Sequence, residues 1–410
     1  MQEESASVGV GYARHADAKT VARSAARQAR EQLGADRRPG WVLVFAGGQH
    51  DAAELHQGLQ QELGALPVVG GCGAGVISGE AAGTSGYECG VMLFPDTLAP
   101  QAIVGVDGLD RDEAEAGRRL GAELRALELS PDTTLLLFYD SVHSAPPPVL
   151  HVGSRLLDGL YEGLGDCAPQ VIGAGTLTDL GLSGSYVFDG RRACRHTAVA
   201  VVLPRALQGH VAVMHGCTPA SDFLEITRLE GPRVLELDGR PALSVVEERL
   251  GIPRSELIAR QPLPSLTLGE KHSDPYAPFN ESQYVNRLVI AVDPADEALV
   301  LFEADFHAGS RVQLMSYEPW RMIESAQEQT RGLLAGLPPQ APAFGLYIDC
   351  AGRSMAFSGM EEDEAAPVRQ QVGALCPFLG FYSGVEIAPF LGRARPLDWT
   401  GVLVVFTHRP

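Results

Sequence analysis

Apolar residues in the first hundred positions alternate between the spacing of strands and the spacing of helices. Short apolar runs at 8–12, 41–46, 67–71 and 90–94 indicate strands. Residues 18–33 are rich in alanine with an amphipathic pattern, and 52–63 repeat that pattern, so both segments are predicted as helices. The segment therefore predicts the order β-α-β-α-β-β.

The same order returns twice further along the chain. The first two strands begin at 8 and 41 in the first unit, at 102 and 134 in the second, and at 312 and 344 in the third. These separations of 33, 32 and 32 residues favour an internal repeat. The alternative is that any α/β protein alternates strands and helices. The prediction is an α/β fold of repeated β-α-β-α-β-β units that form two α/β domains.

An insertion with a different amino-acid composition separates the second and third repeats. Residues 204–311 are rich in β-branched and turn residues, and Asp238-Gly239 between two strand-like runs is typical of a hairpin. Residues 261–284 contain several prolines and little periodicity, which predicts a linker or long loop. The predicted domains are 1–260, comprising units 8–94 and 102–203 and then the β-rich segment, and 285–410.

Charge and cysteine content narrow the class of protein. Thirty-two Lys and Arg against 51 Asp and Glu give a net charge of -19, which disfavours nucleic acid and anionic membranes as partners. The start of the chain lacks a signal-peptide pattern, and no apolar run reaches the roughly 18 residues of a membrane span, so we expect a cytoplasmic protein. Seven dispersed cysteines without a C-x-x-C pair favour reduced thiols over a zinc site or disulfides.

Turns after the inner strands are the predicted place for a binding site. In open α/β sheets, ligands lie beyond the carboxyl ends of strands, where short side chains and glycines let the backbone approach them. Glycine-rich turns at 70–75, 173–179 and 380–386 accompany polar residues after 134–139 and 344–348, and the structural alternative for each glycine is close strand packing. The predicted ligand-binding residues are Cys72, Asp140, Ser141, His143, Gly173, Gly175, Asp179, Cys350, Arg353, Tyr382 and Glu386.

Two other chemistries stay open as alternatives, although no catalytic residue and no metal ligand is assigned. A cysteine-dependent enzyme would use Cys72 or Cys350, but no local hydrolase signature surrounds either, and a buried cysteine is usually an apolar filler. A single axial histidine is enough to bind haem, which is the one cofactor that stays open as an alternative. The weak axial candidates are His143, His151, His196, His210 and His215.

Several segments together resemble the FIST N and FIST C domains. The first resemblance runs through VLVFAGG, PVVGGCGAGVISG, VIGAGTLTD and VLELDGRPAL. The second runs through YVNRLVIAVDPADEALVLFEADFHAGSRVQLM, FGLYIDCAGR and GFYSGVEIAP. Together these segments span nearly the whole chain.

The resemblance implies a sensory module of a signalling protein that binds a small ligand such as an amino acid. It also implies haem-based nitric oxide sensing in some members, and a separate partner such as a histidine kinase or cyclase. The family's Cys-x-x-Arg element falls on Cys350 and Arg353, and its late acidic position falls on Glu386. Val76 stands where many members have glutamate, Val385 where they have glycine, and 397–400 lack a histidine that relatives often carry. These departures weaken the transfer of any particular ligand.

Overall fold

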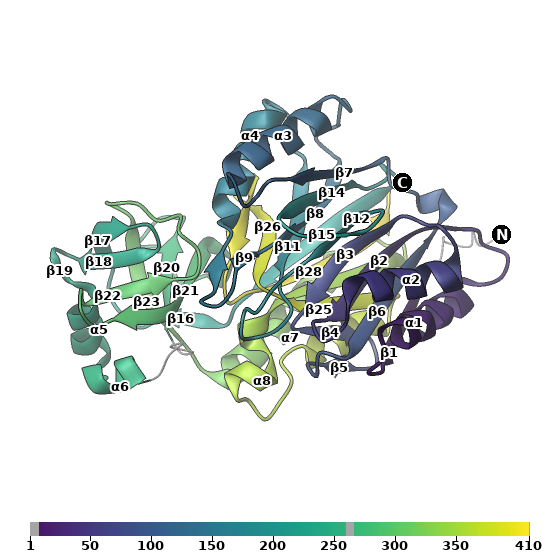
Figure 1. The fold of residues 1–410 in the computed structure, drawn as a ribbon. Coiled ribbons are helices and arrows are strands. Elements are labelled where there is room, and N and C mark those ends of the chain that lie inside the picture. Colours follow the sequence, from purple (N-terminus) through teal and green to yellow (C-terminus); the bar gives the residue numbers. More distant parts are fainter. Residues whose placement is uncertain (1–7, 260–265, 410) are drawn as a thin grey trace. The chain divides into compact units, whose positions relative to one another are not determined.

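The structure is a computed structural model that describes residues 8–259 and 266–409. It divides into two compact units. The larger unit comprises the described residues up to Ala212, Gln327–Pro396 and 401–409, and the smaller unit comprises Val213–Ala326 with Leu397–Thr400. Both combine helices with sheets, and the sheets of the larger unit mix parallel and antiparallel strands, so the fold is mixed α/β (Figure 1). No helix in the described ranges has the length and apolar character that crossing a membrane requires.

The first sheet of the larger unit contains six strands. Their order is β1 (Gly9–Arg14), β6 (Glu88–Pro95), β2 (Pro39–Gly47), β3 (Val68–Gly73), β12 (Val187–Gly190) and β13 (Ala193–Cys194). Helices α1 (Ala18–Leu33) and α2 (Ala52–Leu63) begin at Asp17 and Asp51, whose carboxylates accept from the amides of Thr20 and Glu54. The alanine face of α1 packs on Val42, Val44, Val91 and Leu93, because small side chains let the helix lie close to the sheet.

The second sheet is built mainly from the next chain segment. Its order is β7 (Ala102–Asp107), β14 (Thr197–Val202), β8 (Thr134–Asp140), β11 (Gln170–Thr176), β26 (Val385–Phe390) and β27 (Arg393–Leu397). Helices α3 (Glu113–Arg125) and α4 (Gly153–Leu164) pack together through Gly117 and Gly159, where a Cβ atom would lie about 2 Å from backbone of the other helix. A small hairpin, β9 (Val142–Ser144) and β10 (Val149–Leu150), follows β8.

The third sheet has the order β15 (Leu207–Met214), β28 (Gly401–His408), β24 (Pro342–Cys350), β25 (Phe378–Ser383), β4 (Gly75–Ser78) and β5 (Ala82–Gly83). Helices α7 (Pro319–Ala335), α8 (Met355–Ser358) and α9 (Ala366–Gly373) and the turns η1 (Asp96–Leu98) and η3 (Ala351–Arg353) complete the elements outside the smaller unit's sheet. Each of the three sheets ends on a two-stranded segment from another stretch of chain: β12–β13, β26–β27 and β4–β5. These strand orders do not confirm that the three sheets are copies of one repeated unit, so the predicted repeat stays a prediction.

One predicted strand of the third repeat forms, but in a different sheet from the one predicted. Residues 312–315 lie in β23 (Arg311–Tyr317), which pairs with β16, β17 and β20 in the smaller unit. The first strand of the third sheet is β15, about a hundred residues earlier. The 32-residue spacing from 312 to 344 matched the spacing in the other two predicted repeats only because an apolar strand of the smaller unit's sheet occupies 312–315.

The smaller unit is rich in strands, as the composition of 204–311 predicts. Its sheet runs β16 (Cys217–Pro219), β23, β17 (Leu224–Glu230), β18 (Arg233–Leu237), β22 (Ala298–Leu301), β21 (Tyr284–Asp293) and β20 (Thr267–Lys271). Because β20 also pairs with β23, six of these strands close into a ring. Strand β19 (Arg240–Pro241), the turn η2 (Glu281–Gln283) and helices α5 (Ala242–Leu250) and α6 (Arg254–Ala259) complete the unit.

Two predictions fall within the smaller unit. Asp238 and Gly239 have φ values of 50° and 72° in the turn that pairs β18 with β19, so the predicted hairpin is confirmed. The predicted linker at 261–284 contains β20 and η2, while its residues 261–265 lie outside the described residues. The domain division that rests on this linker stays a prediction.

Candidate functional site

Parallel strands place the predicted site residues side by side in the larger unit. Strand β8 runs parallel to β11 with Asp140 opposite Thr176, and β24 runs parallel to β25 with Cys350 opposite Ser383. Strand β26 joins the two pairs in sequence, because it follows β25 along the chain and pairs with β11 so that Glu386 lies opposite Ala174. Gly173 and Glu386 therefore lie in paired strands of the second sheet, whereas Cys350 lies in the third sheet, on a strand that contacts β26.

A buried arginine binds two buried carboxylates where β24 ends. Arg353 donates from Nε to Asp349 over 2.9 Å and from Nη2 to Glu364 over 2.6 Å. All three side chains are at most 1% exposed. Burial, together with the neighbouring Glu364, raises the pKa of Asp349 well above its usual value. Arg353 thus forms an internal ion pair, and a role toward a ligand carboxylate stays a prediction.

Glu386 extends the same cluster of buried acids. The Ser383 hydroxyl lies 2.7 Å from Glu386 Oε1 and 3.2 Å from the carbonyl oxygen of Asp349, so it joins the two strand ends. Tyr382 occupies the neighbouring position on β25, and its hydroxyl donates to Asp363 over 3.3 Å. The predicted acidic position is therefore inside the fold and hydrogen-bonded.

The glycines of the predicted turns are positions of close backbone packing. A Cβ atom on Gly173 would lie 1.7 Å from the carbonyl oxygen of Leu137, and one on Gly175 would lie 2.8 Å from the Tyr139 ring. Ser141 lies beside Gly175 and donates to the carbonyl oxygen of Thr176 over 2.5 Å. The structure thus shows a packing function at these glycines, and ligand contact there is untested.

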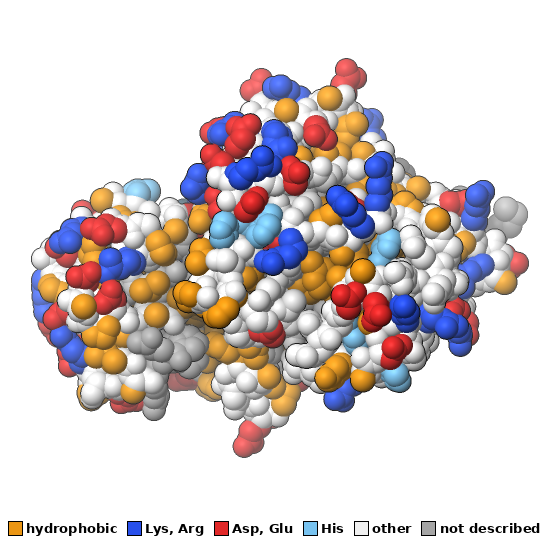
Figure 2. Space-filling view, in the orientation of Figure 1, with side chains coloured by type: hydrophobic (Ala, Val, Ile, Leu, Met, Phe, Trp, Pro, Cys, Tyr) orange, Lys and Arg blue, Asp and Glu red, His pale blue; other side chains and the backbone are white. Residues whose placement is uncertain are grey.

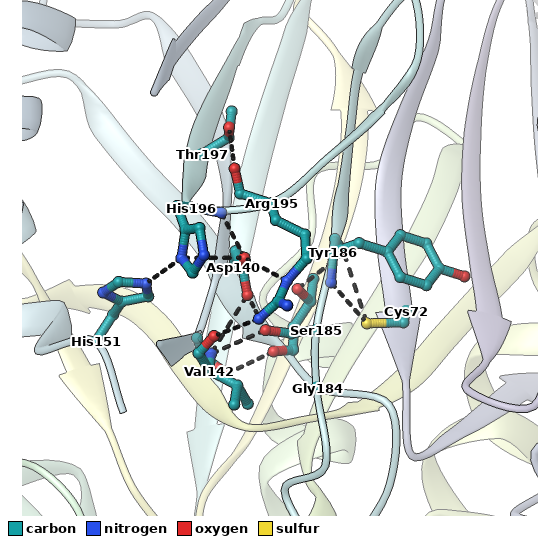
Figure 3. Close-up of polar contacts among 12 residues, drawn as sticks. Cys72, Asp140, Val142, His151, Gly184, Ser185, Tyr186, Arg195, His196 and Thr197 are labelled. Carbon is teal, nitrogen blue, oxygen red and sulfur yellow. Dashed lines mark hydrogen bonds and ion pairs between the residues drawn. The ribbon is translucent and has the colours of Figure 1, made fainter. Parts of the chain in front are cut away.

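Asp140 is the centre of a second polar cluster, at the end of β8 (Figure 3). Its carboxylate accepts from the Ser185 hydroxyl and, over 2.5 Å, from the amide of His196. Arg195 Nε lies 3.8 Å from the same carboxylate, and its Nη2 donates to the carbonyl oxygen of Val142 over 3.3 Å. Burial raises the pKa of Asp140 to about 6, although the hydrogen bond from His196 and the charge of Arg195 oppose this shift. A carboxyl with such a pKa beside an exposed cation is typical of functional sites.

Three histidines surround the open side of this cluster. The ring centroids of His143 and His151 are 5.0 Å apart, those of His151 and His196 are 5.4 Å apart, and those of His143 and His196 are 5.8 Å apart. His151 is fully buried, whereas 28% of the His196 side chain is exposed. Histidine side chains reach the surface beside basic side chains where β9 is labelled in Figure 1 (Figure 2). His196 also has a φ of 50°, a conformation uncommon for a residue other than glycine, and its amide is the one that binds Asp140.

The five haem candidates lie in polar surroundings. His143, His151 and His196 lie against one another among charged groups. Nε2 of His210 lies 2.9 Å from the Thr407 hydroxyl, and Nε2 of His215, in the smaller unit, lies 3.0 Å from the carbonyl oxygen of Glu281. An axial ligand must present a free nitrogen to the porphyrin iron, and haem binding by any of these rings stays a prediction.

The remaining candidates have structural contacts. The amide of Tyr186 donates to Cys72 Sγ over 3.2 Å, and burial raises the pKa of that thiol to about 12. Asp179 accepts from the amide of Gly181 over 2.8 Å and thereby caps its own turn. Ser185, Arg195 and Glu364 belong to the two clusters, and Glu113, at the start of α3, lies 3.5 Å from Nδ1 of His151. These four residues were not predicted, because their sequence neighbourhoods carry no motif and only the fold brings them to the clusters.

A cavity of about 970 Å³ lies elsewhere in the larger unit. Its lining comes from β1, α1 and α9 and includes Tyr12, Gln28, Arg369 and Leu375. None of the predicted site residues is part of that lining. It is therefore a separate candidate place for a ligand.

Comparison with known families identifies the chain. The model of the FIST N domain matches residues 40–240, and that of the FIST C domain matches residues 242–389. The chain belongs to the FIST family. The resemblance expected from the turn and strand motifs is confirmed.

Full-length relatives of this FIST-family chain occur in mycobacteria. Uncharacterized proteins of Mycobacterium tuberculosis and Mycobacterium bovis are each 24% identical over 404 residues, which is 97% of this chain and at least 98% of the relative. Among solved structures, the crystal structure of a chorismatase is similar with 10% identity and a TM-score of 0.34, covering 98% of each chain. A likeness of that size carries no argument about function.

Proposed function

We propose that this chain is an intracellular sensory protein that binds a small carboxylate-bearing molecule, such as an amino acid, and acts through a separate signalling partner. The observation that carries the proposal is the arrangement of Arg195, Asp140 and His143 where β8 ends. FIST domains are linked to sensory small-ligand binding, which supports the general class. The ligand, and a partner such as a histidine kinase or cyclase, belong to the proposal.

The charge distribution at this strand end favours a carboxylate. Arg195 is 53% exposed, and it is oriented by Val142 and by the buried Asp140. A guanidinium held in this way offers planar N–H donors that match the two oxygens of a carboxylate. Asp140 binds Ser185 and the His196 amide, so its role in the proposal is to position Arg195.

The two alternative functions are not favoured. Cys72 is buried with a pKa of about 12, so its thiolate would be almost absent near neutral pH. Cys350 is also buried, at 5% exposure, within β24. Haem binding is not favoured, because the rings of His151, His196, His210 and His215 are hydrogen-bonded to other groups.

Thermal stabilisation by a panel of amino acids and small dicarboxylates tests the proposal. A ligand that binds only the folded state raises the melting temperature. We expect at least one compound to raise the Tm of the wild-type chain, and Arg195→Ala to abolish that increase. Arg205→Ala removes an exposed arginine elsewhere and serves as the matched control.

A substitution in the lining of the separate cavity distinguishes ligand binding in that cavity from ligand binding beside Arg195. Leu375 is 55% exposed and lines the cavity, so Leu375→Arg changes its charge with little cost to the core. Loss of the Tm increase in Leu375→Arg, with the increase retained in Arg195→Ala, would move the ligand to the cavity and contradict the proposed site. No stabilisation by any compound would contradict the ligand class.

A further inference from the structure

The three clustered histidines come from separate segments of the chain. His143 lies in β9, His151 lies between β10 and α4, and His196 lies in the turn between β13 and β14. We propose that His143, His151 and His196 bind a divalent transition-metal ion, with zinc as the best match. This inference does not depend on the proposed sensory function.

The distances within the cluster agree with metal ligation. A tetrahedral zinc ion at about 2.0–2.1 Å from each imidazole nitrogen places two such nitrogens about 3.3 Å apart and the ring centroids roughly 5 Å apart. Nε2 of His151 and Nδ1 of His196 are 3.1 Å apart, and the three centroid separations are 5.0, 5.4 and 5.8 Å. The ring spacings are therefore close to those that a shared ion requires, and the ion would replace the hydrogen bond between His151 and His196.

Glu113 orients the most buried of the three ligands. Its Oε1 lies 3.5 Å from Nδ1 of His151, and the opposite ring nitrogen, Nε2, faces His196. A carboxylate behind a histidine favours the tautomer with the proton on the near nitrogen, which leaves a lone pair on the far one. This carboxylate–histidine arrangement recurs behind metal-bound histidines in general.

The ion would require one side chain to turn. With the side chains as they stand, no group of three His, Cys, Asp or Glu residues among the described residues could hold a metal ion. His143 is half-buried on the short hairpin, and no hydrogen bond is recorded for its ring within the described ranges. Rotation of His143 about its side-chain bonds directs a nitrogen toward His151 and His196 without moving the backbone.

The donor set decides the class of metal. Neutral imidazoles suit zinc, copper, nickel and iron, whereas calcium and magnesium prefer oxygen ligands. The acids Glu113 and Asp140 offset the positive charge of the ion, and Arg195 and Arg155 are the nearby cations. Three protein ligands leave one position of a tetrahedral ion open to water or to another ligand.

Titration with Zn²⁺ alone, after removal of metal with a chelator, tests the inference. Isothermal titration calorimetry should give one equivalent per wild-type chain, and Co²⁺ should give the visible absorption of a tetrahedral site. His143→Ala and His196→Ala should each weaken Zn²⁺ binding at least tenfold, and Glu113→Gln should weaken it about 10–100-fold.

His210→Ala is the control, because His210 lies on β15 and contacts Thr407 rather than the cluster. It should bind Zn²⁺ as the wild-type chain does. Circular dichroism confirms that each variant folds, which is expected because His143 and His196 are partly exposed. Absence of a stoichiometric site in the wild-type chain, or unchanged affinity in the His143→Ala/His196→Ala double variant, would overturn the inference.

Discussion

Arg353 and Glu364 form an ion pair that is closed to solvent, with 2.6 Å between Nη2 and Oε2 and side-chain exposures of 0% and 1%. Glu364 lies in the connection between α8 and α9, whereas Arg353 follows β24, so the pair ties this connection to the sheet. Arg353 also donates a hydrogen bond to Asp349, which lies in β24 itself. The arginine therefore neutralises carboxylates from two segments of the larger unit.

Removal of Arg353 should destabilise the fold strongly. Arg353→Ala leaves Glu364 and Asp349 buried without their cation, and breaking a buried pair in this way costs about 3–5 kcal/mol. Urea unfolding followed by circular dichroism measures the loss, with Arg205→Ala as an exposed control expected within about 0.5 kcal/mol of wild type. A loss below about 1 kcal/mol in Arg353→Ala would contradict the role assigned to the pair.

Asp140 should make the larger unit less stable as the pH rises from about 4 to about 6. The pKa of Asp140 is about 6 in the folded chain against an ordinary value of 3.8, so within this window the folded state holds a proton that the unfolded state has released. The free energy of unfolding therefore falls with increasing pH through the window and levels off above it. The difference of 2.2 pKa units corresponds to about 3 kcal/mol.

Asp140→Asn isolates this contribution. Asparagine is nearly the same size and does not titrate in this window, so the variant should lack the decrease. Urea unfolding of dilute protein between about pH 4 and about pH 7 should show the stability difference between variant and wild type shifting by about 2 kcal/mol in favour of the variant, because the rest of the total change lies below pH 4. A difference that stays constant across this range would show that Asp140 does not titrate there.

Gly173 and Gly332 should respond to alanine in opposite directions. A Cβ atom on Gly173 would lie 1.7 Å from a backbone oxygen. Gly173→Ala should therefore lower the free energy of unfolding by about 1–3 kcal/mol through overpacking. Nothing lies within 4 Å of a Cβ atom on Gly332, an exposed residue of α7, so Gly332→Ala should stabilise by up to about 1 kcal/mol. Thermal unfolding of both variants checks the pair, and a well-tolerated Gly173→Ala would argue against tight strand packing there.

Buried thiols should react slowly in the folded chain. Burial raises the pKa of Cys72, Cys89 and Cys376 to about 12, and thiolate is the reactive form. With Ellman's reagent near neutral pH, the half-buried Cys167 should label first, whereas burial and Asp189 raise the pKa of Cys194 to about 11 and should slow its reaction. The five buried thiols should label on unfolding. Rapid labelling of Cys72 or Cys350 in folded protein, located by mass spectrometry, would restore the cysteine-enzyme alternative.

Local patterns predicted many individual elements correctly. Helix α1 was readable because an alanine-rich amphipathic stretch follows Asp17, whose carboxylate caps its first turn. The hairpin at Asp238-Gly239 was readable because few residue pairs accept positive φ at both positions. The strand at 312–315 was misassigned because periodicity identifies a strand but says nothing about which sheet it joins.

The sequence by itself determined the family and the elements, because turn motifs and apolar periodicity are local properties of the chain. It also placed Asp140, Cys350 and Arg353 at strand ends, since polar residues directly follow apolar runs there. Only the tertiary structure decided that Arg353 binds Glu364, that Arg195 lies beside Asp140, and that three histidines meet. Those contacts join segments that are far apart in sequence or separated by irregular loops, and strand pairing between distant stretches, which no local pattern encodes, brings them together.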